Sequence, residues 1–213
     1  MKKFILPLLL LLFVGSLFAV ESDPSEVVGY VKYDLAVGDN TIALPMYEAY
    51  TLASEVGNAI GATAVGYFNS ANQEWESIDA FPWGGWSGDF NVTNGQALWV
   101  NVAAAASFYS LGDMPETIPN YSLVAGNNMI MLPLNESALN LASLVGDDIG
   151  ATAVLHFNSA TQAWESVYAY PWGGWSGDFP TSIGSPLWVN AAVAGTWPTP
   201  TRGAVQKIGL SKK

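Results

Sequence analysis

The sequence predicts a mainly β (α+β) fold of two tandem homologous β-sandwich or barrel-like units, each with one short helix, related by a pseudo-twofold axis. The first observation is an internal repeat. Ile60-Gly-Ala-Thr-Ala-Val65 recurs as Ile149-Gly-Ala-Thr-Ala-Val154, and the match continues without a gap to Leu98–Asn101 and Leu187–Asn190. The second is short runs of β-branched and aromatic residues, separated by Gly, Asn and Pro, which are typical of strands and turns.

The repeat divides the chain into five parts. We expect a signal peptide at 1–19, repeat unit 1 at 28–111, a linker at 112–117, repeat unit 2 at 118–197 and a basic C-terminal tail at 198–213. The linker is short and contains a proline, which favours two units that pack against each other; the alternative is two loosely tethered domains.

Each unit is expected to begin with strands and a helix. Alternating side chains predict a strand over 28–35, and a turn at 38–40 leads into a second strand over 41–44. Leu52, Val56 and Ile60 share one face of a helix with Thr51 as its predicted N-cap, and Asn140 takes that place in unit 2. Gly61 and Gly150 follow where C-terminal caps belong. Gly57 and Gly146 weaken the helices, which therefore need a sheet beneath them.

The remaining elements of unit 1 are expected to be a hairpin and a last strand. The hairpin has arms at 62–68 and 73–78, with an Asn- and Ser-containing turn at 69–72. A final strand is predicted over 98–102.

Composition and charge limit the location and the partners. Two lysines, an apolar run over 4–14 and small residues at Gly15, Ser16 and Ala19 form the pattern of a secretory signal peptide. No later run is long enough for a membrane span, so a secreted or cell-surface protein without an integral membrane anchor is expected. There is no cysteine, and no Lys or Arg lies between Lys32 and Arg202. Such an acidic body repels phosphate backbones, which argues against nucleic acid as a partner.

The most distinctive motif is Pro82-Trp-Gly-Gly-Trp-Ser-Gly-Asp-Phe90, which is repeated letter for letter as 171–179. Its glycines predict a loop. Because indole faces stack on sugar rings and a carboxylate accepts hydroxyl hydrogen bonds, the loops form a candidate glycan site. The candidate residues are Trp83, Trp86, Asp89, Trp172, Trp175 and Asp178. The alternative is that these residues close the end of each β unit.

Catalytic and metal-binding alternatives have weaker support. A glycosidase pair could combine Glu76 with Asp89, and Glu165 repeats Glu76 in the second unit. His156 is the single histidine and is expected to be a strand side chain without an accompanying nucleophile motif. Calcium could bind Asp147-Asp148 or the loop carboxylates, but no calcium loop of recognisable spacing is present. We therefore expect no enzyme activity, no metal and no cofactor.

Asn40–Pro45 with Gly95–Val102, and Asn128–Pro133 with Gly184–Asn190, carry a resemblance to a known kind of repeat. The chain resembles tandem β-rich units of bacterial secreted and cell-surface proteins that open with Asn-Leu-Ile-x-Leu-Pro and close with Gly-x-x-Tyr-Trp-Val-Asn-Val. That resemblance implies an appended surface module and carries over no catalytic residues to this chain, and the tryptophan-rich nonapeptide is not part of the pattern. We expect a non-catalytic protein with a structural, self-associating or adhesive role, whose partner is itself or an extracellular polysaccharide. The alternatives are a carbohydrate-binding module that uses the tryptophan loops and, more remotely, a glycoside hydrolase.

Overall fold

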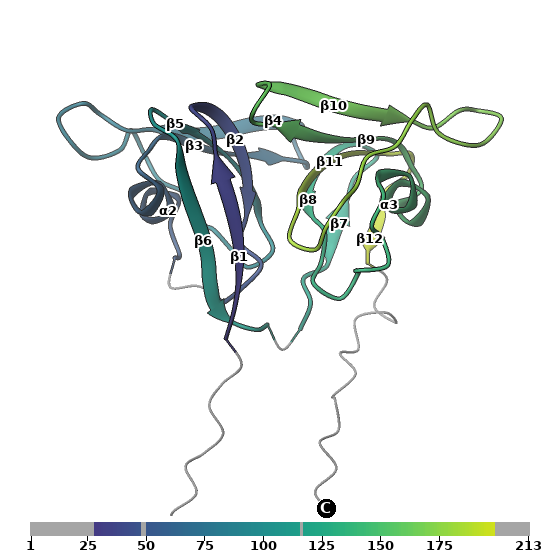
Figure 1. Ribbon diagram of the computed structural model, residues 1–213, viewed down its shortest axis with the longest axis horizontal. Coiled ribbons are helices and arrows are strands. Elements are labelled where there is room, and N and C mark those ends of the chain that lie inside the picture. The colour runs from purple at the N-terminus through teal and green to yellow at the C-terminus, as the bar shows by residue number, and fades with distance from the viewer. Residues whose placement is uncertain (1–27, 48–49, 116, 199–213) are drawn as a thin grey trace, which may run out of the picture.

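The computed structural model describes residues 28–47, 50–115 and 117–198. The predicted signal peptide and all of the basic tail except Pro198 lie outside the described residues. Within the described part, two similar β units lie side by side (Figure 1). The predicted fold class is therefore confirmed.

Unit 1 combines a four-stranded antiparallel sheet with a two-stranded ribbon and a helix. The sheet has the order β2-β5-β3-β4, and its strands are β2 (Gly38–Ala43), β3 (Ala62–Asn69), β4 (Glu74–Asp79) and β5 (Ala97–Val102). The ribbon pairs β1 (Val28–Leu35) with β6 (Ala106–Asp113), and the helix is α2 (Ala53–Ile60).

Unit 2 repeats this arrangement. Its sheet has the order β8-β11-β9-β10, with β8 (Gly126–Met131), β9 (Ala151–Asn158), β10 (Ala163–Tyr168) and β11 (Pro186–Ala191). Its ribbon pairs β7 (Tyr121–Leu123) with β12 (Gly195–Trp197), and its helix is α3 (Ala142–Ile149). The ribbon of unit 2 is much shorter than that of unit 1, which is the main departure from symmetry.

Each unit has its own hydrophobic core between the sheet and the helix. In unit 1 the fully buried side chains include Ile42, Val56, Val65 and Leu98. Their equivalents in unit 2, which are buried in the same way, are Ile130, Val145, Val154 and Leu187. The repeated apolar pattern thus forms the same core twice.

The sequence predicted the C-terminal ends of the two helices correctly but not their N-terminal ends. Gly61 and Gly150 are the C-caps in the left-handed conformation, as predicted. The predicted N-caps Thr51 and Asn140 are wrong by one residue, since Leu52 and Leu141 precede the helices. A leucine can take this position because the tryptophan loops supply the acceptors. The Phe90 and Phe179 carbonyls accept the first helix amides, and the Asp89 and Asp178 carboxylates accept the second.

The prediction for the end of unit 1 is also incomplete, because it lacks one strand. The predicted last strand matches β5, but β6 follows it and continues through Asp113, so the first two residues of the predicted linker belong to this strand. The strand was missed because its burial departs from polarity beyond Phe108, which faces the core. Ser110 faces inward and is buried, whereas Tyr109 and Leu111 are exposed.

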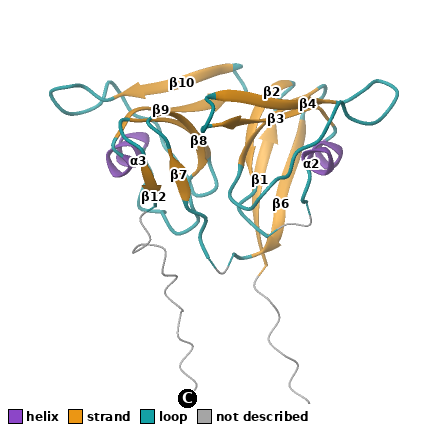
Figure 2. Cartoon of the chain, turned by 180° about the vertical axis from the view of Figure 1, so that it is seen from behind, coloured by secondary structure: helices purple, strands orange, loops and turns teal. Residues whose placement is uncertain are grey.

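The contacts between the units obey the pseudo-twofold symmetry. The Tyr33 hydroxyl donates to the Gly184 carbonyl at 2.7 Å, and the equivalent Tyr121 hydroxyl donates to the Gly95 carbonyl at 2.8 Å. The hairpins β3–β4 and β9–β10 meet at the top of the molecule, and both ends of the described chain lie on the opposite side (Figure 2). No helix of the described residues is long and apolar enough to cross a membrane.

Candidate functional site

The two tryptophan loops project from opposite ends of the molecule's long axis, one after β4 and one after β10 (Figure 1). Each is closed at its base by an isolated bridge, Ala80 to Trp86 and Ala169 to Trp175. In unit 1 the tip turns at Gly84 and Gly85, whose φ angles of 96° and 86° are disfavoured for other residues. The amide of Phe81 donates to the Gly85 carbonyl at 2.9 Å, so the tip is held by its own backbone.

The first tryptophan of each loop is exposed at the tip. Trp83 and Trp172 each have 81% of their surface exposed. Trp83 stacks on Phe81 with ring centroids 5.1 Å apart and planes 6° apart, and Trp172 stacks on Tyr170 at 5.0 Å and 8°. Because the supporting ring covers only one face of each indole, the other face is open to a ligand.

The second tryptophan of each loop packs on the helix instead. A Cβ atom at Gly57 would lie 2.4 Å from the Trp86 ring, and one at Gly146 would lie even closer to Trp175. The indole Nε1 groups donate to Asn58 Oδ1 at 3.1 Å and to Asp147 Oδ1 at 2.9 Å. The helix glycines therefore admit the indoles, and these two rings serve the core of each unit rather than the loop tip.

The loop carboxylates act as helix caps. Asp89 accepts the Ser54 amide at 3.1 Å and the Ser54 hydroxyl, and Asp178 accepts the same two groups of Ser143. Partial burial raises the pKa of both carboxylates, but the hydrogen bonds from these serines and from nearby backbone amides outweigh it, so each pKa is lower than usual. The six candidate residues thus divide into an exposed indole at each tip and an indole and carboxylate at each base.

The glutamates of the Trp-Glu-Ser triplets are held by neighbours on their own hairpins. Glu76 accepts a hydrogen bond from the Asn69 amide at 2.7 Å. Glu165 bonds to the Asn158 amide and lies 2.9 Å from His156 Nε2. The hydrogen bonds from Asn69 and Tyr67 lower the pKa of Glu76, and those from Asn158 and His156 lower the pKa of Glu165. A general acid of a glycosidase requires a shift in the other direction.

His156 is a side chain of strand β9, as the sequence predicted, and its ring lies 4.4 Å from that of Phe179. Asp147 and Asp148, considered as calcium ligands, accept hydrogen bonds from Trp175 and Trp197. Among the residues that the structure describes, no group of three or more His, Cys, Asp or Glu side chains is arranged to hold a metal ion.

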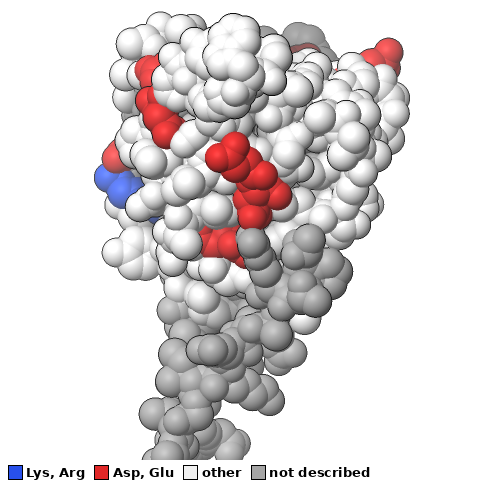
Figure 3. Space-filling model, turned by 90° about the vertical axis from the view of Figure 1, so that its right-hand side faces the viewer, with Lys and Arg blue, Asp and Glu red and all other residues white. Residues whose placement is uncertain are grey.

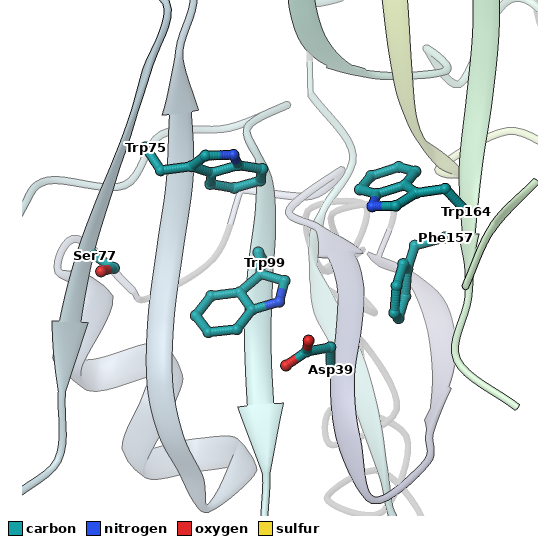
Figure 4. A pocket seen from close by; sticks show the side chains of 6 residues that line it. All are labelled: Asp39, Trp75, Ser77, Trp99, Phe157 and Trp164. Carbon is teal, nitrogen blue, oxygen red and sulfur yellow. The ribbon is translucent and has the colours of Figure 1, made fainter. Parts of the chain in front are cut away.

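The structure also brings together aromatic residues that the sequence did not single out. A cavity of about 350 Å³ lies at the junction of the two units and is lined by Asp39, Trp75, Ser77, Trp99, Phe157 and Trp164. Figure 4 shows Trp75 and Trp164 from the two hairpins, with Trp99 and Phe157 below them and the Asp39 carboxylate between and below these two rings. The first four of the six belong to unit 1 and the last two to unit 2.

A sequence signal for this cavity did exist. Trp75 and Trp99 stand on the outer face of their strands, because the residues that alternate with them, such as Ile78 and Leu98, face the core. Large aromatic side chains on the solvent face of a sheet need a covering partner or a ligand. The partner is the second unit, which sequence spacing alone does not place.

No protein-family model matches this chain, and no curated protein or solved structure does so either. Its function is therefore inferred from its own geometry.

Proposed function

We propose that this protein is a non-catalytic, exported adhesive module that binds extracellular polysaccharide through two loop tips and so bridges two polymer chains or surfaces. The observation that carries the proposal is the pair of open indoles, Trp83 and Trp172, at opposite ends of the molecule. Each tip presents two stacked, exposed aromatic rings, and clustered apolar surface of this kind is typical of a binding site.

The form of the tip suits a sugar ring on a polymer surface. Each open indole is flat, is backed by a second ring and sits on a loop held by its own hydrogen bonds. Pyranose rings present apolar C–H faces that stack on such platforms. Since the loop is already ordered, little conformational entropy is lost on binding.

The charge distribution favours a neutral or basic polymer over a polyanion. Within the described residues Lys32 is the one Lys or Arg side chain, and it pairs with Asp34 at 2.6 Å. Figure 3, which views the end formed by unit 2, shows exposed Asp and Glu side chains over that face. Uncharged polysaccharides and chitosan-like chains meet no repulsion there.

The hydrogen bonds and the lowered pKa values of the four repeated carboxylates support a binding role rather than a hydrolytic one. Asp89 and Asp178 are occupied as helix caps, and Glu76 and Glu165 have lowered pKa values and partners on their own hairpins. None of the four has the raised pKa that proton donation to a glycosidic oxygen requires.

The test is co-sedimentation of the mature chain with insoluble cellulose, chitin and peptidoglycan. The parent protein is expected to sediment with at least one of them, and the Trp83→Ala/Trp172→Ala double variant is expected to bind at least about tenfold more weakly, since stacking on an indole contributes on the order of 1 to 2 kcal/mol per site.

The matched control is Tyr30→Ala, which removes an exposed aromatic ring from the β1–β6 ribbon, away from both loops. It should bind like the parent. Failure of the parent to bind any of the three polymers, or equal binding by the double variant, would refute the glycan role. Concentration-dependent growth in mass by light scattering, lost in the same double variant, would instead assign the tips to self-association.

A further inference from the structure

The junction cavity is a second site, independent of the loop tips. Its walls are three indoles and a phenyl ring, and its polar groups are the Asp39 carboxylate and the Ser77 hydroxyl. Trp75 and Trp164 remain nearly half-exposed although they lie beside this cavity (Figure 4). The cavity is therefore accessible from the top face, where the two hairpins meet.

The lining of the cavity does not follow the pseudo-twofold symmetry, since it includes Asp39 and Trp99 but not their unit 2 equivalents Asn127 and Trp188. The equivalents of Gly66 and Thr41 in unit 2 are Leu155 and Met129, which flank Trp188 on their sheet as Gly66 and Thr41 flank Trp99. The small residues leave room on the unit 1 side. On the unit 2 side these positions hold the larger residues. There the Trp188 ring contacts the rings of Phe68, Trp75 and Trp164.

A charge difference falls at the same place. Asp39 of unit 1 is Asn127 in unit 2, and each accepts a hydrogen bond from the neighbouring strand, Asp39 from Asn101 at 2.7 Å and Asn127 from Asn190 at 2.9 Å. The fold therefore accepts an amide at this position. In unit 1 the second carboxylate oxygen has no hydrogen-bond partner among the described residues, so it is available to a ligand.

These features together define the ligand's chemistry. Indole faces carry partial negative charge, the cavity contains one carboxylate, and no basic side chain lines it. An anion would be repelled, and a neutral sugar would find few donors and acceptors. An alkylated ammonium ion has an apolar shell for the rings and a positive charge for the carboxylate.

We propose that the junction cavity binds a small organic cation of the quaternary ammonium class, held by the faces of Trp75, Trp99 and Trp164 and paired with Asp39. Cation–π contacts with several rings supply the affinity, and the carboxylate supplies the charge selectivity. The site needs both units, because Phe157 and Trp164 come from the second one.

The test is calorimetric titration of the mature chain with tetramethylammonium, with choline, and with 3,3-dimethylbutan-1-ol, the uncharged analogue of choline. Both cations should bind saturably, and the uncharged analogue should bind at least about tenfold more weakly, because it has the same shape but no charge. Phosphocholine should bind more weakly than choline, because its phosphate meets an acidic surface.

The variant Asp39→Asn converts the position to the residue found in unit 2 and should weaken choline binding about three- to tenfold without loss of fold. Asp79→Asn is its control, since it removes a carboxylate that lies on β4 outside the cavity. Circular dichroism of both variants should match the parent. Equal affinity for choline and its uncharged analogue, the absence of saturable binding, or equal weakening by both variants would overturn the proposal.

Discussion

At the scale of single residues, glycines decide where the tryptophans lie. Gly57 and Gly146 lie inside the helices α2 and α3, where each costs about 1 kcal/mol relative to alanine. Each glycine lets an indole approach closer than any side chain would allow. The sequence shows the cost of these glycines but not their purpose, because the partner indole is far along the chain.

The variant Gly57→Ala should therefore destabilise the protein, although helix propensity alone predicts the reverse. The added methyl group overlaps the Trp86 ring, and we expect a loss of about 2 kcal/mol or more in the free energy of unfolding, as in overpacked cores. Urea denaturation followed by tryptophan fluorescence measures it. Gly88→Ala is the control, since its Cβ would make ordinary contact with Ile78 at 3.7 Å.

The loop carboxylates give a second residue-scale prediction. Asp89→Ala and Asp178→Ala should each lower the free energy of unfolding by about 1 kcal/mol, the usual effect of losing an N-terminal cap. Because the pKa of each carboxylate is lowered in the folded state, its contribution is present above the ordinary pKa of aspartate and is lost as the pH falls through the folded value.

Urea midpoints measured from pH 7 down to pH 2.5 test this. The parent should lose stability below about pH 4, and the double alanine variant should show a flatter dependence over that range. Equal slopes for the two proteins would mean that the caps do not contribute as described.

At the scale of elements, the hairpin tips hold the two units together. The amide of Gln162 accepts from the Asp39 N–H at 2.8 Å and donates to the Asp39 carbonyl at 2.9 Å, which covers the free edge of β2. Gln73 makes the equivalent pair of bonds with Asn127 on β8. Both glutamines have positive φ angles, 59° for Gln73 and 54° for Gln162, in a region where glycine is the favoured residue.

Replacement of Gln73 by glycine separates the effect of its side-chain hydrogen bonds from that of its positive φ angle. Glycine adopts this backbone angle readily but has no side chain. We expect Gln73→Gly to lower the free energy of unfolding by about 1 to 2 kcal/mol through the lost hydrogen bonds to unit 2. Differential scanning calorimetry measures the change. A stabilised variant would mean that relief of the strained backbone outweighs the contact between the units.

The elements also show what a sequence can predict here. Strand β1, the hairpin turns and the helix C-caps follow from local patterns and are confirmed. The side-chain caps from Asp89 and Asp178 are not local, since each carboxylate lies 35 residues along the chain from the serine amide that it accepts. Strand β6 was missed because the burial of its serine and the exposure of its leucine do not follow polarity.

At the scale of the whole molecule, duplication produces a pair of loop tips, and the meeting of the two units produces the junction cavity. The tips remain identical in sequence and lie at opposite ends, which suits the bridging of two polymers. The two units differ around the cavity at Asp39, which lines it, and at Gly66 and Thr41, which flank Trp99. The loop motif was visible as a repeat, but its division into an exposed tip and a packed base required the helix to be placed against it.

The most direct test of the bridging role is the turbidity of a fine suspension of the polymer that binds best, mixed with a substoichiometric amount of protein. The parent should aggregate the particles. Trp83→Ala and Trp172→Ala, tested as single variants, should each still bind through the remaining tip but should not aggregate them. Aggregation by either single variant would contradict the assignment of one binding surface to each end of the molecule.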